Sequence, residues 1–362
     1  MIVLSLLVGH IPNIPHHAIE LRDRGFTVVP NAGLSPTLIG NARAAVDRDF
    51  SALQSAATTV GLDSTGQNYL FAEFATRHQF RFDLRPCVKQ SAWTSLAKDA
   101  TSAASPIIEF VHTSLPPHPD DSEPLLALSR HLVPAQPTLD QIGAILSQPG
   151  AAAQRFHADA DDTHFQLARL CPRHRLYNVF IPLVDVTTDG TQFWPGSHLG
   201  RNLEGQFRAA VERSARSADG TQGHLEDDAQ ARAEMEAPAC PAGGMIIFDF
   251  RILHRGLPNA GRDRPLVYTV LGTGYAHDRA NFPTDSLLSL AAAIPDGDDA
   301  ESRAMRSSMR AEIRAMWPTW DELYESEDEA ERFLEPRERF VQVDESRSDQ
   351  GMLAGRPTSK AA

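Results

Sequence analysis

Three apolar runs with turn residues between them constrain the fold of this chain more than any other feature. They are LYNVFIPLVDV (176–186), GGMIIFDFRILHRG (243–256) and RPLVYTVLGTGY (264–275), and the turn-rich TTDGTQFWPGSH (187–198) follows the first. Short strands joined by Gly, Pro and Asp turns are typical of antiparallel barrels and sandwiches. We therefore expect a β core over about residues 151–275, interrupted by a polar, exposed, helix-prone insert at about 201–238.

The segments on either side of this core predict helices. GFTVVPNAG (25–33) predicts a short strand, and Ser35-Pro36 then opens a helix, because serine is a good N-cap and proline suits the first helical position. Residues 90–150 indicate mixed helix and loop, so the part from 1 to about 150 is expected to be helix-rich. A charged helical extension is expected at about 296–340 and a disordered tail at 341–362, which leaves one domain over 1–340.

Composition narrows the range of partners. Hydrophobic residues make up 42% of the 362, enough for a large core, and 34 Lys+Arg against 47 Asp+Glu give a net charge of -13. An acidic chain repels phosphate backbones, so we expect a small-molecule substrate rather than nucleic acid. Three scattered cysteines favour a reducing compartment, and neither a signal peptide nor a membrane span is expected, which predicts a cytoplasmic location. The oligomeric state stays open.

The segment QRFHADADD (154–162) contains a histidine and a carboxylate two residues apart. In an extended chain, side chains at i and i+2 point to the same face, so His157 and Asp159 would both face the barrel interior. A second histidine, His254, closes the apolar run GMIIFDFRIL. Two histidines and one carboxylate on one face of a metal leave three positions open, which is the signature of non-haem Fe(II) oxygenases.

A bidentate keto acid at such a metal needs an anchor for its far carboxylate. Arg264 lies across a turn from His254 at the start of RPLVYTVL, and a guanidinium can hold a carboxylate with two charge-assisted hydrogen bonds. Arg262 competes for this role, because the turn NAGRDRP brings both arginines near the strand. Arg264 is preferred since it directly precedes the apolar strand.

Other histidines fit a metal site less well. His118-Pro119-Asp120 is a second H-x-D, but prolines on both sides of His118 make a strand interior improbable. His164 follows an acidic turn and is expected to be exposed, and His198, after a Pro-Gly turn, is expected to be structural.

Several of these segments in register resemble the phytanoyl-CoA dioxygenase family of Fe(II)/2-oxoglutarate-dependent oxygenases. The resemblance covers roughly residues 20–275 and rests on LRDRGFTVVPNAGLSPTLI, HADADD, NVFIPLVDVTTDGTQFWPGSHLG and AGGMIIFDFRILHRGLPNAGRDRPLVY. It implies a mainly β fold with flanking helices, built on a double-stranded β-helix (jelly roll). It also implies hydroxylation or desaturation of a small organic substrate, coupled to conversion of 2-oxoglutarate and O2 into succinate and CO2, with ascorbate as a stimulant.

The resemblance assigns roles to individual residues. It makes His157, Asp159 and His254 the iron ligands and Arg264 the 2-oxoglutarate anchor. Gln154 resembles a position that in some members contacts the co-substrate or the substrate, and Thr191 resembles a co-substrate contact. Two other functions stay open: a non-catalytic metal-binding sensor on the same barrel, and a zinc hydrolase, since His, Asp and His also hold zinc.

Overall fold

The computed structural model describes most of the chain between residues 11 and 316. The described ranges are 11–62, 70–78, 80–85, 92–116, 134–154, 156–160, 164, 167–168, 171, 173–199, 233–274, 276–278, 285–294 and 297–316. In chain order the elements are α1 (Ile14–Arg24), β1 (Phe26–Val29), α2 (Pro36–Thr59), β2 (Phe74–His78), β3 (Arg81–Leu84), α3 (Ala92–Thr113), β4 (Thr138–Ser147), β5 (Leu176–Pro182), β6 (Thr191–Phe193), η1 (Ser197–Leu199), β7 (Met245–Asp249), β8 (His254–Gly256), β9 (Arg264–Gly272), α8 (Leu287–Ala292) and α9 (Ala300–Met316).

The strands form two sheets. The larger has seven strands in the order β1-β7-β5-β9-β4-β3-β2, and every neighbouring pair is antiparallel. The smaller pairs β6 with β8, and isolated bridges extend it, including His157 with His254 and Ala151 with Asn259. This arrangement, mainly antiparallel β with flanking helices, is the predicted fold class.

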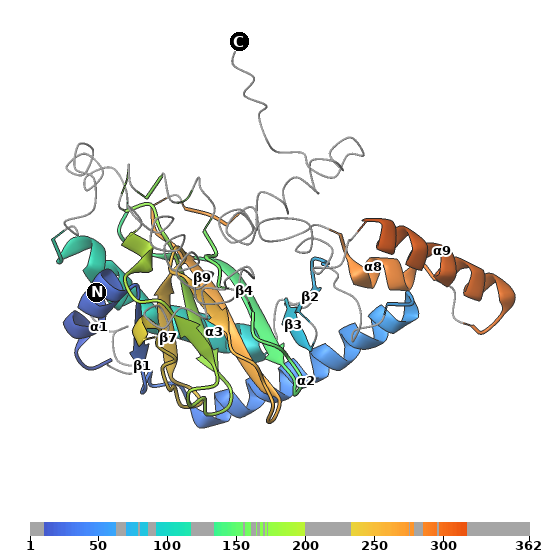
Figure 1. Cartoon of the computed structure of the whole chain (residues 1–362), viewed down its shortest axis with the longest axis horizontal. Helices are drawn as coiled ribbons and strands as arrows, with labels where there is room; N and C mark the ends of the chain where they lie inside the picture. Colours follow the sequence, from blue (N-terminus) through green and yellow to red (C-terminus); the bar gives the residue numbers. More distant parts are fainter. Residues whose placement is uncertain are drawn as a thin grey trace, which may run out of the picture.

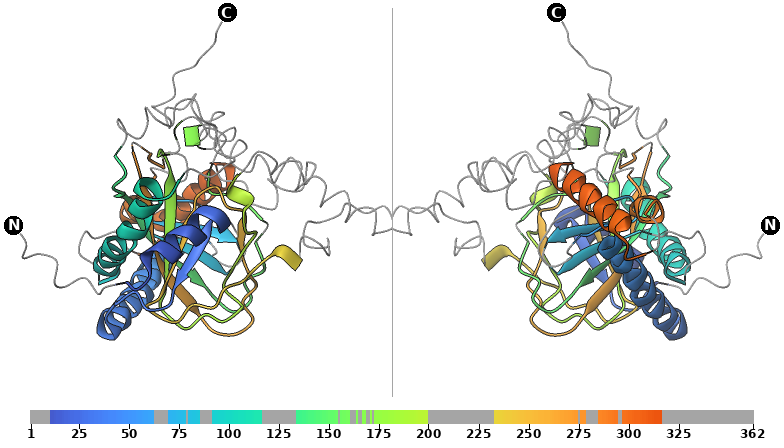
Figure 2. Two further views of the ribbon diagram at one scale, coloured as in Figure 1. Left: turned by 90° about the vertical axis from the view of Figure 1, so that its left-hand side faces the viewer. Right: turned by 90° about the vertical axis from the view of Figure 1, so that its right-hand side faces the viewer.

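Strand β5 shows that side chains pack against both faces of the large sheet. All seven of its residues are buried, because both faces of the sheet are covered. Tyr177, Val179 and Ile181 pack into the cluster that contains the buried faces of α2 and α3. Leu176 and Phe180 point the other way, into a second cluster inside the barrel. Figure 2 shows α1, α2 and α3 together on one side of the barrel strands.

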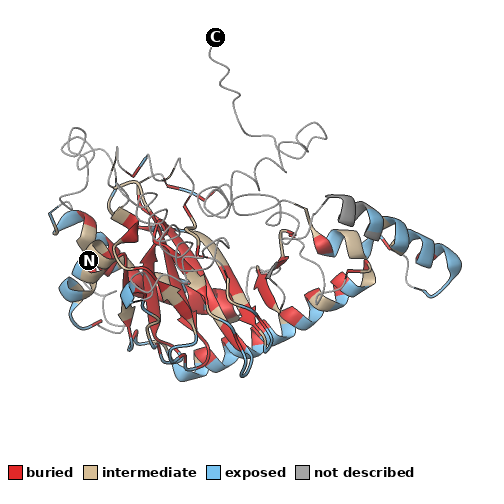
Figure 3. Cartoon of the chain, in the orientation of Figure 1, coloured by how far each residue is buried: buried red, intermediate tan, exposed pale blue. Residues whose placement is uncertain are grey.

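Helix α2 begins where the sequence predicts. The Ser35 hydroxyl accepts a hydrogen bond from Leu38 N, and Pro36 occupies the first turn. The helix runs beneath the large sheet, with its buried side toward the strands and its exposed side toward solvent (Figures 1 and 3). The predicted strand at 25–33 is β1, at one edge of the large sheet.

The prediction of mixed helix and loop over residues 90–150 is wrong in part. Helix α3 is present, but residues 138–147 form β4, a ten-residue strand that pairs with β9 and β3. The sequence TLDQIGAILS lacks clear alternation because only its second half is buried, so its strand character was not visible locally. Strands β1 to β4 therefore bring the expected helix-rich N-terminal part into the large sheet.

Helix α9 begins the predicted C-terminal extension and lies at the far end of α2 beside α8, largely exposed (Figures 1 and 3). Residues 201–232 of the predicted insert (about 201–238) and the chain beyond residue 316 lie outside the described residues. No helix in the described part of the chain combines the length and apolar character needed to cross a membrane.

Candidate metal centre

The two predicted histidine ligands face each other across a pair of antiparallel segments. His157 N donates to His254 O at 3.0 Å, and His254 N donates to His157 O at 2.9 Å. Gln154 N also donates to Gly256 O, so residues 151–157 run antiparallel to 254–259. The imidazole rings consequently lie 4.5 Å apart between centroids.

Asp159 completes the cluster from two residues beyond His157. One ligand atom from each of His157, Asp159 and His254 lies within 4.8 Å of the others. His157 Nε2 is 4.0 Å from Asp159 Oδ1, and His254 Nε2 is 3.6 Å from Asp159 Oδ2. Within the described residues, no other group of His, Cys, Asp and Glu offers ligand atoms this close together.

Hydrogen bonds behind the cluster orient its ligand atoms. His254 Nδ1 donates to Ile252 O at 3.0 Å, which leaves Nε2 with a free lone pair on the side of Asp159. Asn178 Nδ2 donates to Asp159 Oδ2 at 2.7 Å from strand β5, where its side chain is buried. Both contacts are of the kind that orients ligands in metal sites, so the residues fit a bound divalent metal.

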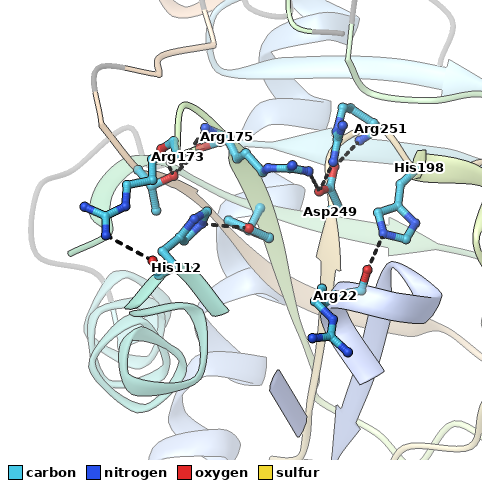
Figure 4. Close-up of polar contacts among 9 residues, drawn as sticks. Arg22, His112, Arg173, Arg175, His198, Asp249 and Arg251 are labelled. Atoms are coloured by element: carbon cyan, nitrogen blue, oxygen red, sulfur yellow. Dashed lines mark hydrogen bonds and ion pairs between the residues drawn. The ribbon is translucent and has the colours of Figure 1, made fainter. Parts of the chain in front are cut away.

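The turn that presents His254 is held by a buried charge cluster (Figure 4). Asp249, at the end of β7, accepts from Arg251 N at 3.0 Å, Arg251 Nε at 2.9 Å and Arg251 Nη2 at 2.8 Å. Arg175 Nη1 adds a fourth bond to Asp249 at 3.3 Å. Because Arg251 precedes Ile252, this cluster sets the carbonyl group to which His254 donates.

The PGSH segment supports the same turn from the outside. Ser197 Oγ accepts from Leu253 N at 2.8 Å, directly before His254. His198 Nε2 bonds to Arg22 O at 2.9 Å, tying α1 to the site (Figure 4). His198 is thus placed in the structural role expected of it, with no ligand atom in the cluster.

Two aromatic side chains pack against the His254 ring. Phe248 and Phe193 place their ring centroids 5.0 and 6.0 Å from His254. Phe156 is also buried, but its ring packs against the Arg255 guanidinium. His118, of the second H-x-D, lies outside the described residues.

Arg264 and Arg262 differ in solvent exposure. Arg264 is 7% exposed, and its Nη2 donates to Leu257 O at 3.1 Å while its Nη1 bonds Asp189 O. Burial lowers the pKa of Arg264, and the Asp189 carboxylate, 3.4 Å from Nη1, opposes that shift. Arg262 is exposed and donates to Asp185 O on the outer surface.

Gln154 and Thr191, the two other co-substrate candidates, both lie at Gly256, two residues after His254. Gln154 Oε1 accepts from Gly256 N at 2.9 Å, so its amide nitrogen is the group that can still reach a ligand. Thr191 is buried on β6 directly opposite Gly256.

Sequence comparison identifies the family. The phytanoyl-CoA dioxygenase (PhyH) family model matches residues 21–265. The chain belongs to the phytanoyl-CoA dioxygenase family. Fe(II) and 2-oxoglutarate are the cofactors of this family, so the chain is a 2-oxoglutarate-dependent non-haem iron oxygenase. Among curated proteins, no sequence matches the chain.

Solved structures similar to this family member share little sequence with it. AviO1 from Streptomyces viridochromogenes Tue57 is 18% identical with a TM-score of 0.44, over 75% of this chain and 99% of its own. EvdO2 from Micromonospora carbonacea var. aurantiaca, complexed with 2-oxoglutarate, is 17% identical with a TM-score of 0.42, over 75% and 95%. HygX from Streptomyces hygroscopicus, with nickel and 2-oxoglutarate bound, is 12% identical with a TM-score of 0.42, over 72% and 88%.

Sequence reasoning missed Asn178, the buried amide that donates to Asp159. Asn178 had a visible signal, because it is the one amide inside the apolar run LYNVFIPLVDV.

Proposed function

We propose that this chain oxidises a small organic substrate at a C–H bond, by hydroxylation or desaturation, and converts 2-oxoglutarate and O2 to succinate and CO2. In this proposal His157, Asp159 and His254 hold Fe(II). The convergence of their ligand atoms within 4.8 Å is the observation that carries it. When bound, the iron would supply the redox chemistry that activates O2, at positions the three protein ligands leave open.

The protein's own side chains would bind and orient the co-substrate. Arg264 is the proposed anchor for its far carboxylate, supported by burial at the start of β9 and by the exposed position of Arg262. Gln154 and Thr191 are proposed to contact the co-substrate between the metal and that anchor, because both lie against Gly256. Phe193 and Phe248 would keep water from the reacting atoms.

The test begins with the wild-type protein under anaerobic conditions. Titration with Fe(II) and then 2-oxoglutarate should produce a visible charge-transfer band, and admission of O2 should release succinate even without substrate. Band formation without succinate would favour the non-catalytic sensor. Hydrolytic activity with zinc, and no band with iron, would favour the zinc hydrolase.

The anchor is tested separately with a pair of arginine variants. Arg264→Ala should raise the KM for 2-oxoglutarate about 10- to several-hundred-fold, as expected for loss of a charge-assisted contact worth roughly 1.5–3 kcal/mol. Arg262→Ala, the matched control two residues away, should change it little. Reversed effects would show that the anchor is Arg262.

The substrate class is proposed no more finely than a small organic molecule, since substrate selection in such folds depends on loops and flanking helices. A cytoplasmic location stays a prediction. It is supported by the free thiols of Cys171 and Cys240, the two described cysteines.

A further inference from the structure

A row of three polar side chains crosses the large sheet and ends at Arg264, the proposed co-substrate anchor. Arg81 on β3 is the register partner of Ser147 on β4, and Ser147 is the partner of Arg264 on β9. Side chains of directly opposed residues share one face of a sheet, so all three point to the same side. All are buried, with exposures of 5% for Arg81, 2% for Ser147 and 7% for Arg264.

The two guanidinium groups of this row converge on one carbonyl oxygen. Arg81 Nη2 donates to Leu257 O at 2.9 Å, and Arg264 Nη2 donates to the same oxygen at 3.1 Å. Two donors on one acceptor lie within a few ångströms of each other, so two buried positive charges are held side by side. This proximity, together with burial, lowers the pKa of Arg81 to about 10, with burial the larger cause.

The described protein compensates only one of these charges. Arg264 pairs with the Asp189 carboxylate. Arg81 donates to Ala152 O and Leu257 O, and no carboxylate in the described residues lies within ion-pair distance of it. Arginine is almost never buried without a counter-charge, so this arrangement calls for an anion.

Two further donors of the row are available to such an anion. Arg81 Nε and the Ser147 hydroxyl are buried and make no hydrogen bond with any described residue. Unsatisfied buried donors are rare in folded proteins and point to a missing partner. Together with Arg264 they provide donors on neighbouring strands, which suits the planar, two-oxygen geometry of a carboxylate.

Gly256 places this row next to the metal ligands. It lies two residues after His254 on β8, and a Cβ there would overlap Arg81 Nη1 and lie 2.6 Å from Gln154 Oε1. The Arg81 guanidinium therefore occupies the space that any side chain at position 256 would take. This explains why glycine follows His254-Arg255.

We propose that Arg81 and Ser147 join Arg264 in a cradle for the far carboxylate of the co-substrate, and that Arg81 makes the site selective for dicarboxylic 2-oxo acids. The inference rests on the proposed function, because it takes 2-oxoglutarate as the ligand. A 2-oxo acid with a single carboxylate uses that group at the metal and leaves the second guanidinium uncompensated. Arg81 is thus a positioning and specificity residue rather than a redox participant.

The test measures equilibrium binding, not turnover. Anaerobic calorimetry on the Mn(II)-loaded protein compares 2-oxoglutarate with 2-oxobutanoate, which keeps the metal-binding end and lacks the far carboxylate. Arg81→Gln should weaken 2-oxoglutarate binding about 10- to 100-fold and leave 2-oxobutanoate within about twofold. Arg262→Gln, an exposed arginine close by, should change neither. Gly256→Ala should weaken 2-oxoglutarate selectively by displacing the guanidinium while keeping its charge.

Each outcome bears on one claim. If the wild type binds no 2-oxoglutarate, the proposed function fails before this inference is reached. If Arg264→Ala loses 2-oxoglutarate and Arg81→Gln does not, the cradle is refuted. Equal loss of both ligands in Arg81→Gln would assign Arg81 a structural role and also refute it. Should Arg81→Gln fail to fold or to bind Mn(II), Arg81→Lys decides, because it keeps the charge and loses the planar fork. Unchanged selectivity in that variant overturns the proposal.

Discussion

The amide of Asn178 allows a sharp test of how the metal centre is built. Its Nδ2 donates to Asp159 Oδ2 at 2.7 Å, and the residue is 4% exposed. In Asn178→Leu the shape is roughly kept but the donor is lost, so Asp159 Oδ2 loses this hydrogen bond. A hydrogen bond to a charged group contributes about 1.5–3 kcal/mol.

That loss should appear mainly in metal affinity. Second-sphere partners of metal ligands typically contribute about 10- to 100-fold to affinity, which agrees with the hydrogen-bond energy at about tenfold per 1.4 kcal/mol. We expect Asn178→Leu to bind Mn(II) about 10- to 100-fold more weakly than the wild type, measured anaerobically by equilibrium dialysis.

The neighbouring residue supplies a matched control. Tyr177 faces the opposite side of β5, and its hydroxyl bonds to His112 Nε2 at 2.9 Å in the helical layer. Tyr177→Phe removes one buried hydrogen bond from the same strand and should lower the free energy of unfolding by about 1 kcal/mol. Its Mn(II) affinity should not change. Wild-type affinity in a folded Asn178→Leu, or equal loss in both variants, would refute the orienting role of Asn178.

Three further outcomes are expected. Asp159→Ala and Asp159→Glu should lose bound iron and 2-oxoglutarate-dependent succinate formation, because Asp159 is a proposed iron ligand. The wild type should neither require nor incorporate chloride, because Asp159 as a ligand would fill the position that a halide needs. Wild-type iron content in Asp159→Ala would contradict this proposal. His118→Ala, outside the described residues, should keep its iron content by metal analysis, and a loss would identify the other H-x-D as the ligand pair. The pKa of His112 is lowered to about 3, chiefly by burial. Its stabilising effect is therefore present above pH about 6.5 and lost as the pH falls toward 3, at up to about 1.4 kcal/mol per unit. Urea unfolding of His112→Gln should show a shallower loss between pH about 7 and about 5, and a slope equal to that of the wild type would contradict it.

The parts of the site that the sequence predicts are those set by local periodicity. His157 and Asp159 share a face because they are two residues apart in an extended segment, and His254 follows an apolar strand whose end is visible in the sequence. The choice of Arg264 over Arg262 rests on the position of Arg264 directly before the apolar strand, and the structure buries Arg264 and exposes Arg262.

Contacts that depend on strand order were beyond this reasoning. Arg81 reaches Leu257 across a separation of 176 residues, and does so because β3 lies two strands away from β9 in the large sheet. That order places β4 between them, and β4 itself was missed because half of it is not buried. Asn178 could be noticed as an amide in an apolar run, but its contact with Asp159 requires knowing which face of β5 lines the barrel.

The charge of this chain acts differently at its surface and in its interior. A net charge of -13 disfavours polyanions that must approach an extended surface, since that interaction sums over many exposed groups. It says little about a small anion, because at a buried site the nearest charges dominate and screening by solvent is weak. There Arg81 and Arg264 lie side by side, and only Arg264 pairs with a carboxylate of the described residues, that of Asp189, whose side chain is 56% exposed. An acidic protein can thus hold a doubly charged co-substrate such as 2-oxoglutarate. It needs two arginines that are distant in the chain, here Arg81 and Arg264, to lie close together in the folded sheet.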